Sequence, residues 1–79
     1  MEQVELLEQA RLYRVYCYKL NNGKKEKKVW YECEDMKTEE GISWSFDKKI
    51  CIDKAITKGF KTMNADQPII RYYRVKDTP

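Results

Sequence analysis

Residues 12–35 read LYRVYCYKLNNGKKEKKVWYECED, and this pattern predicts a β-hairpin. Leu12 to Leu20 are rich in the aromatic and β-branched side chains that favour strands, and Val29 to Asp35 form the return strand. Between them, the sequence Asn21-Asn22-Gly23 is typical of a tight turn. The other predicted elements flank this hairpin.

The length of the turn decides which side chains share a face of the hairpin. A three-residue loop with Gly23 in the left-handed conformation pairs odd-numbered residues with odd-numbered ones. It predicts a core face made of Tyr13, Val15, Cys17, Val29, Tyr31 and Cys33. A two-residue Asn22-Gly23 turn shifts the pairing by one residue and exchanges the faces of the return strand. We favour the three-residue loop, because it leaves Glu32 and Glu34 outside with Arg14.

Strands and a short helix are predicted on both sides of the hairpin. Residues 2–10 are good helix formers, although a helix this short forms only if it packs on something. Apolar residues alternate with serines over 42–46, which predicts a short half-buried strand with Trp44 packed in the core over the main helix. Pro68 ends the preceding segment, and residues 69–76 predict a last strand.

The main helix is predicted from Asp47 to about Met63. Asp47 is a typical N-terminal cap. Apolar residues then recur at helical spacing, at Ile52, Ala55, Ile56, Gly59, Phe60 and Met63. We therefore expect one α+β domain over residues 1–79. Its small antiparallel or mixed sheet has three to four strands, with one amphipathic helix packed on one face, in the order (α)-β-β-β-α-β.

The absence of histidine from the sequence limits the chemistry of the protein. It excludes a Ser-His or Cys-His nucleophile pair and any His-ligated metal site. Cys17, Cys33 and Cys51 lack C-x-x-C spacing and fall short of a four-ligand zinc site. The three glycines lie far apart, so there is no phosphate-binding loop. We expect no enzyme activity, no metal site and no cofactor.

The cysteines also indicate a cellular compartment. An odd number of cysteines in so short a chain favours reduced thiols over disulfides. The first residues are acidic and contain no continuous apolar run, so we expect no signal peptide, and no stretch is long enough to span a membrane. The sequence therefore predicts a cytoplasmic protein.

The charges lie in blocks along the chain. The sequence has 16 basic and 13 acidic residues, a net charge of +3. Its pI of about 8.7 is milder than the pI above ~9 that is usual for nucleic-acid-binding domains. Acidic residues gather near the start and over 32–40, and lysines over 19–28 and 48–61. A fold that keeps these blocks apart gives a molecule with two oppositely charged sides.

Two surfaces carry the candidate binding residues. The outer face of the hairpin combines aromatic and basic side chains, which suit base stacking and phosphate attraction as well as a protein interface. The outer face of the main helix carries lysines, either as a solvated face or as a basic strip. These residues are Arg14, Tyr16, Tyr18, Lys28, Trp30, Lys54, Lys58 and Lys61. In a competing arrangement, the N-terminal helix covers the hairpin face, with Val4 and Leu7 against Tyr16 and Trp30.

We expect a small non-enzymatic protein that docks on another protein and inhibits or regulates it. Its size and its lysine and tyrosine content are typical of accessory proteins of phages or mobile elements. The alternative is a nucleic-acid-binding module that uses the aromatic and basic face of the sheet. The protein partner is favoured, because the acidic blocks would repel a nucleic acid. Any nucleic-acid binding is then expected to be weak and lost near physiological salt.

Overall fold

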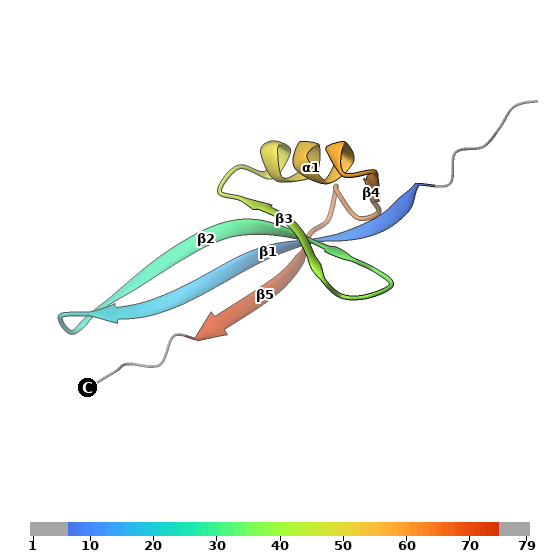
Figure 1. The fold of residues 1–79 in the computed structure, drawn as a ribbon. Helices are drawn as coiled ribbons and strands as arrows, with labels where there is room; N and C mark the ends of the chain where they lie inside the picture. Colours follow the sequence, from blue (N-terminus) through green and yellow to red (C-terminus); the bar gives the residue numbers. More distant parts are fainter. Residues whose placement is uncertain (1–6, 75–79) are drawn as a thin grey trace, which may run out of the picture.

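The computed structural model describes residues 7–74, which form one curled, half-barrel-like sheet with a single short helix (Figure 1). The elements in chain order are β1 (Glu8–Asn21), β2 (Lys24–Asp35), β3 (Gly41–Ser45), α1 (Lys48–Thr57), β4 (Phe60–Thr62) and β5 (Ile69–Arg74). β1 lies at the centre of the sheet. β2 pairs with it antiparallel on one side, and β3 extends the sheet beyond β2. On the other side, β4 and β5 pair in succession with β1, both parallel to it.

The expected sheet of three to four strands with one packed helix is wrong. The described residues contain five strands, and β-structure dominates the fold. Two segments that were predicted as helix are strands. Glu8–Ala10 begin β1, while residues 2–6 of the predicted N-terminal helix lie outside the described residues. Phe60–Thr62 form β4. Glu8–Ala10 and Phe60–Thr62 are strands because they pair with each other, parallel, at the edge of the sheet.

The predicted register of the hairpin is also wrong. Asn21 pairs with Lys24, so the turn has two residues, Asn22 and Gly23, with φ angles of 51° and 76°. Both positive angles fit a type I′ turn, the form that matches the twist of the strands and that an Asn-Gly sequence favours. Leu12 therefore lies opposite Cys33.

The register divides the side chains of the sheet between two faces. On the first face, Leu12 lies opposite Cys33, and α1 packs there; we call it the helix face. On the second, Val15 lies opposite Trp30, and we call it the open face. The predicted core face combined side chains that in fact lie on both sides of the sheet.

The core lies between α1 and the near end of the hairpin. Its buried members are Ala10, Leu12, Cys33, Ile42, Cys51 and Ala55, with Tyr31, Ile52 and Phe60 packed around them. Val15 is also fully buried, on the open face. Trp44 is 55% exposed and Ile56 57% exposed, so the prediction that both are core residues is wrong.

The main helix begins where the sequence predicts and ends early. Asp47 has an extended backbone, and its side chain accepts a hydrogen bond from the Ile50 amide at 3.1 Å, which confirms the predicted cap. The helix ends at Thr57, because Gly59 takes a φ of 89° that terminates helices. The apolar residues after Gly59 therefore do not continue a helical stripe.

Asn64 closes a gap in the pairing of β1. Between the part of β1 that pairs with β4 and the part that pairs with β5, the backbone of Leu12 has no strand partner on that side. The side-chain amide of Asn64 takes the place of one. Its oxygen accepts from the Leu12 amide at 2.7 Å, and its nitrogen donates to the Leu12 carbonyl at 3.0 Å. One side chain thus keeps two backbone groups of a fully buried residue hydrogen-bonded.

The burial pattern predicts different stabilities for two truncations. Leu12→Ala is expected to lower the free energy of unfolding by about 2–5 kcal/mol, because it empties space in the core. Ile56→Ala, at an exposed helix position, is expected to change it by about 0.5 kcal/mol or less. Urea denaturation followed by tryptophan fluorescence measures both values. Equal effects of the two substitutions would contradict the core described above.

The role of Asn64 predicts a large effect from a polar surface residue. Asn64→Ala leaves the amide and carbonyl of Leu12 without partners, and we expect a loss of about 2–4 kcal/mol in the free energy of unfolding. Hydrogen exchange at the Leu12 amide should accelerate as well. Gln67→Ala, in the same loop, is the matched control and should melt like the parent protein.

Candidate functional site

The structure separates the predicted hairpin residues into two groups. Arg14, Tyr16 and Tyr18 lie on the helix face, beyond the end that α1 covers. Lys28 and Trp30 lie on the open face, because the two-residue turn shifts β2 by one residue. The five residues predicted to act together therefore do not form one surface.

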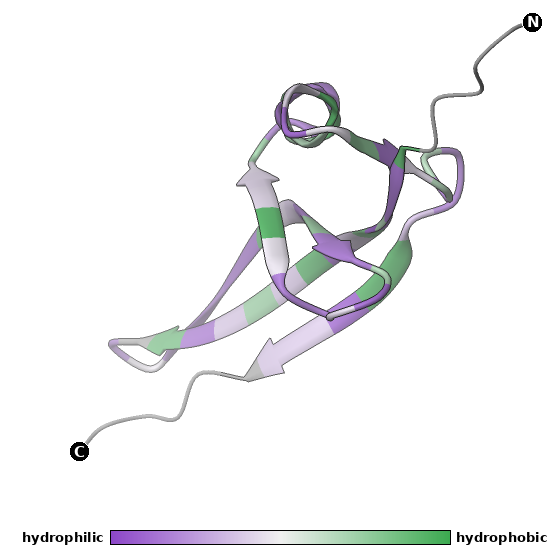
Figure 2. Ribbon diagram, turned by 45° about the vertical axis from the view of Figure 1, so that its right-hand side comes forward, coloured by the Kyte–Doolittle hydropathy of each residue, from purple (hydrophilic) through white to green (hydrophobic). Residues whose placement is uncertain are grey.

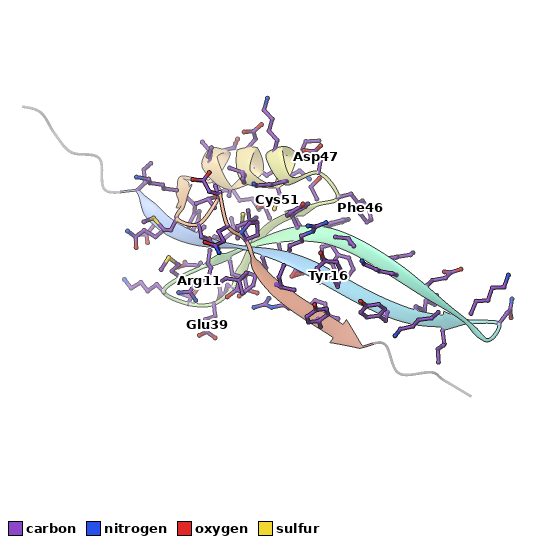
Figure 3. All side chains as sticks on the ribbon, turned by 180° about the vertical axis from the view of Figure 1, so that it is seen from behind. Arg11, Tyr16, Glu39, Phe46, Asp47 and Cys51 are labelled. Atoms are coloured by element: carbon purple, nitrogen blue, oxygen red, sulfur yellow. The ribbon has the colours of Figure 1, made fainter. Side chains whose placement is uncertain are left out.

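A ladder of tyrosines occupies the uncovered part of the helix face. Tyr72, from β5, stacks on Tyr16 with ring centroids 5.5 Å apart and on Tyr18 at 6.4 Å. Tyr72 is 67% exposed, and Tyr16 lies well away from Cys51 in the core beneath α1 (Figure 3). Sequence reasoning missed Tyr72, because only the pairing of β5 with β1 brings it beside the other two rings.

Three cations lie over these rings. The Arg14 guanidinium is 5.3 Å from the centroid of Tyr16, and the Lys27 ammonium is 4.6 Å from the same ring. The Lys25 ammonium is 4.5 Å from the centroid of Tyr18. We call the set of Arg14, Tyr16, Tyr18, Lys25, Lys27 and Tyr72 the tyrosine surface. Such cation–π contacts hold the long basic side chains close to the aromatic rings.

The acidic side chains of the sheet lie away from the tyrosine surface. In the register of β1 and β2, Glu26, Glu32 and Glu34 all fall on the open face. The acidic residues of the loop between β2 and β3, such as Glu39, lie at the opposite end of the molecule from the hairpin turn (Figure 3). By the same register, Arg11, Lys19 and Lys28 also fall on the open face. The open face therefore carries both signs of charge, whereas the charged groups of the tyrosine surface are all basic.

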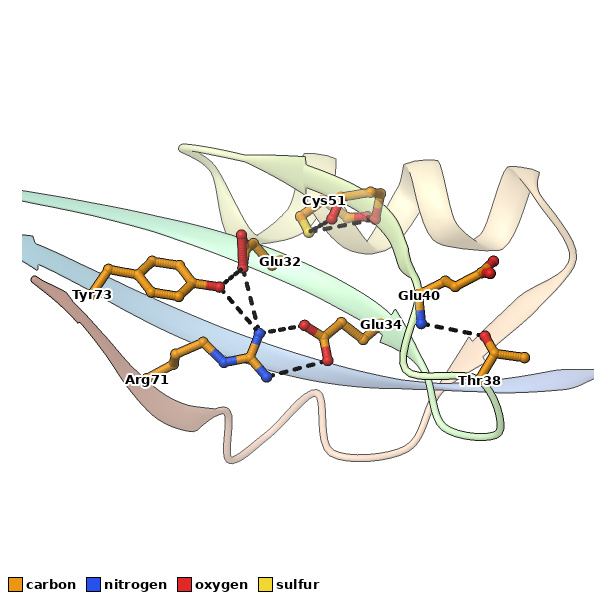
Figure 4. Close-up of polar contacts among 8 residues, drawn as sticks. Glu32, Glu34, Thr38, Glu40, Cys51, Arg71 and Tyr73 are labelled. Carbon is orange, nitrogen blue, oxygen red and sulfur yellow. Dashed lines mark hydrogen bonds and ion pairs between the residues drawn. The ribbon is translucent and has the colours of Figure 1, made fainter. Parts of the chain in front are cut away.

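On the open face, Arg71 from β5 holds two carboxylates of β2 (Figure 4). Its guanidinium forms a two-pronged ion pair with Glu34 and lies 3.7 Å from a carboxylate oxygen of Glu32. The hydrogen bonds to Glu34 raise the pKa of Arg71, and the guanidinium also lies 3.7 Å from the centroid of the Tyr13 ring. The Tyr73 hydroxyl donates to Glu32 at 3.4 Å. This network partly neutralises the acidic residues of β2.

Aromatic side chains also line a groove on the open face. The groove has a volume of about 360 Å³ and is lined by Lys28, Trp30, Glu32, Trp44 and Phe46. Trp44 and Phe46 meet edge to face at 5.4 Å, and Phe46 is 67% exposed. Trp30 stacks on Tyr73 at 6.1 Å. The predicted residues Lys28 and Trp30 belong to this groove.

The predicted lysines of the main helix do not form a basic strip. The Lys58 ammonium donates to the carbonyl of Ile42, and the Lys54 ammonium donates to the carbonyl of Trp44 at 3.4 Å. Both carbonyls belong to β3, at the edge of the sheet. Lys61 lies on β4, exposed and apart from the other two, because the helix ends before it.

Two cysteines face each other in the core. The Cys51 thiol donates to Cys33 Sγ at 3.7 Å, and the Ser43 hydroxyl donates to the Cys51 carbonyl at 2.8 Å. The hydrogen bond between the thiols lowers the pKa of Cys33 to about 6 and raises that of Cys51. Both cysteines are fully buried, whereas Cys17 is half-buried, and all three are free thiols.

Comparisons with known proteins assign no family to the chain. No protein-family model, curated protein or solved structure matches it. Among residues 7–74, no three His, Cys, Asp or Glu side chains are grouped so that they could hold a metal ion. Within the same residues, no helix has the length and apolar character needed to cross a membrane.

Burial predicts the order in which the thiols react. In the native protein, Cys17 should be alkylated first, because Cys33 and Cys51 are inaccessible despite the lowered pKa of Cys33. All three should react at similar rates in 6 M guanidinium chloride. Iodoacetamide labelling with peptide mass spectrometry measures the order. Rapid native labelling of Cys33 would mean that α1 opens readily from the sheet.

Proposed function

We propose that this protein is a non-enzymatic binding protein whose tyrosine surface binds single-stranded nucleic acid. One observation carries the proposal. Three stacked tyrosines are flanked by three cations, and the glutamates of β2, Glu26, Glu32 and Glu34, lie on the opposite face. The buried, free thiols of Cys33 and Cys51 support a reducing compartment, and we place the protein in the cytoplasm.

The chemistry of the tyrosine surface fits an unpaired strand. Each base that stacks on an aromatic side chain contributes about 1–3 kcal/mol, and every base offers a ring face. The exposed ring of Tyr72 is available for such stacking. Arg14, Lys25 and Lys27 lie within about one side-chain length of the rings, where they could pair with phosphates on either side of a stacked base.

The sequence favoured a protein partner over a nucleic acid because acidic residues would repel phosphates. The fold removes this objection. That ranking assumed that the acidic blocks share a surface with the lysines of the hairpin. Glu32 and Glu34 instead lie on the open face, and Arg71 pairs with both. Among the residues that define the tyrosine surface, the charged groups are all basic and none would oppose a phosphate chain.

Docking on a protein partner is the second candidate function, and the groove on the open face favours it. Trp44 and Phe46 are more than half exposed beside Trp30, and tryptophan is among the residues that most often carry binding energy at interfaces. A protein bound there would be inhibited or regulated by occlusion. This function uses the open face alone.

Fluorescence anisotropy with labelled oligonucleotides tests the first function. A single strand should bind more tightly than a duplex, and log affinity should fall against log salt with a slope of about 2, from three phosphate contacts at ~0.7 each. Tyr72→Ala should weaken binding by about 1–3 kcal/mol through lost stacking. A Lys25→Gln, Lys27→Gln double variant should reduce the slope by about 1.4.

Trp44→Ala is the matched control for this experiment, since it removes an exposed aromatic ring from the opposite face. It should bind the oligonucleotide like the parent protein. If Tyr72→Ala and the parent bind equally, or if neither binds at low salt, the proposal is wrong. Binding that depends on Trp44 and not on Tyr72 would assign the open face as the site.

A further inference from the structure

The sheet edges at β3 and at β5 differ in whether lysine side chains cover their backbone groups. An edge strand exposes unpaired backbone groups that can pair with another chain, and proteins usually protect them with charged side chains, especially lysine. At the β3 edge, Lys54 and Lys58 donate to the carbonyls of Trp44 and Ile42. Within residues 7–74, no lysine donates to a carbonyl of β5 in this way, and the guanidinium of Arg71 on β5 is directed to Glu34 of β2.

The side chains of β5 add to this contrast. Ile69, Ile70, Tyr72 and Tyr73 are each at least 40% exposed. Figure 2 shows the apolar start of the strand and its open side, where no other ribbon of the described residues runs beside it. Four of the six residues of this edge strand, Ile69, Ile70, Tyr72 and Tyr73, are thus of types with high β-propensity.

We propose that β5 pairs antiparallel with β5 of a second copy of this chain, so that two sheets become one. A two-fold axis perpendicular to the sheet relates antiparallel strands and keeps each face on its own side. A second copy fits this edge because β5 is self-complementary in such an arrangement, with Tyr72 opposite Tyr72 and Arg71 opposite Tyr73. This inference does not depend on nucleic-acid binding.

Among axes at Ile70, Arg71 and Tyr72, the residue types of β5 favour the axis at Tyr72. Opposite residues must lie on the same face, so the axis passes through a residue. An axis at Arg71 would oppose two guanidinium groups, and an axis at Ile70 would bring Pro68, which lacks an N–H, into the ladder. An axis at Tyr72 places Tyr72 opposite its own copy and Arg71 opposite Tyr73, which are favourable aromatic and cation–aromatic pairs.

The pairing joins the two tyrosine surfaces. Tyr72 lies on the helix face, as do Tyr16 and Tyr18, so both tyrosine surfaces face the same way on either side of the axis. A contact of about five residues per strand is smaller than a standard interface, so the dimer is expected to be weak, with a Kd of about 10 µM to 1 mM. Monomers then predominate in dilute solution.

Sedimentation velocity and hydrogen exchange on the parent chain test the dimer itself. The weight-average mass should rise from 9.5 kDa toward twice that value as the protein concentration increases. The amides of β5 should exchange more slowly at high concentration, while those of β3 should not change. A mass of 9.5 kDa throughout, or concentration-dependent protection in β3 instead of β5, would overturn the proposal.

A charge-swap experiment tests the register. Tyr72→Lys and Tyr72→Glu should each be monomeric, because like charges would meet at the axis, and an equimolar mixture should form a heterodimer. Circular dichroism confirms that each variant is folded. Ile56→Lys is the control and should dimerise like the parent, because Ile56 is an apolar residue on α1 that is 57% exposed, against 67% for Tyr72. Dimers of either single variant, or a mixture of folded variants that stays monomeric, would overturn the register.

Discussion

The fold depends on which groups form hydrogen bonds with the second edge of the long central strand β1. On one side, β2 pairs with β1 from Ala10 to Asn21, but on the other side no single strand is long enough to match β1. Two short parallel strands share that edge, and the Asn64 amide pairs with Leu12 between them. Because a parallel partner requires a crossover, the chain must pass over the sheet between β3 and β4, and α1 is that crossover. The helix lies over the sheet because β4 must run parallel to β1, and the chain between β3 and β4 has to cross the sheet to allow this.

This arrangement also determines where binding surfaces form. The crossover is short, and α1 has only ten residues, so it covers the end of the sheet near β4 and leaves the rest of the hairpin uncovered. A sheet with an uncovered face needs side chains that shield the backbone and tolerate water. Tyrosines with cations above them meet both needs, since the rings pack on one another while the hydroxyl and ammonium groups remain solvated. The tyrosine surface therefore stabilises the projecting hairpin and also presents exposed aromatic and basic groups to solvent.

The features that the sequence could predict are those that local chemistry decides. Asp47 caps a helix, alternation marks β3, and residues 69–74 form a strand, as predicted. The register of the hairpin was not predictable from alternation, because apolar side chains occur on both faces of β1, and Val15 is as buried as Leu12. The Asn22-Gly23 turn decides between the two registers. Placing Glu34 on the face that carries Val15 costs little, because Arg71 forms an ion pair with it there.

Contacts between distant segments account for the remaining differences. Local sequence predicted a helix at Glu8–Ala10 and at Phe60–Thr62, whereas the two segments pair with each other as parallel strands. Arg14, Tyr16 and Tyr18 were identified as binding candidates on one surface. Their aromatic neighbour was taken to be Trp30 across the hairpin, whereas it is Tyr72 from a strand that begins more than 50 residues later than residue 16. Lys54 and Lys58 were predicted to form a basic strip on the helix. The sequence does not show that β3 lies beside them and that its carbonyls accept hydrogen bonds from both lysines.

Glu32 and Glu34 lie on the face opposite the tyrosine surface, and this placement would allow a protein with a net charge of only +3 to bind a polyanion. Side chains on the two faces of a sheet point in opposite directions, so their charged groups lie on the order of 10 Å apart or more. At physiological ionic strength the Debye length is about 8 Å, and charges beyond that distance are largely screened. Glu32 and Glu34 are moreover paired with Arg71, which leaves that cluster with a formal charge of −1. A phosphate at the tyrosine surface would therefore interact mainly with Arg14, Lys25 and Lys27, and the local charge is a better guide to its binding than the total.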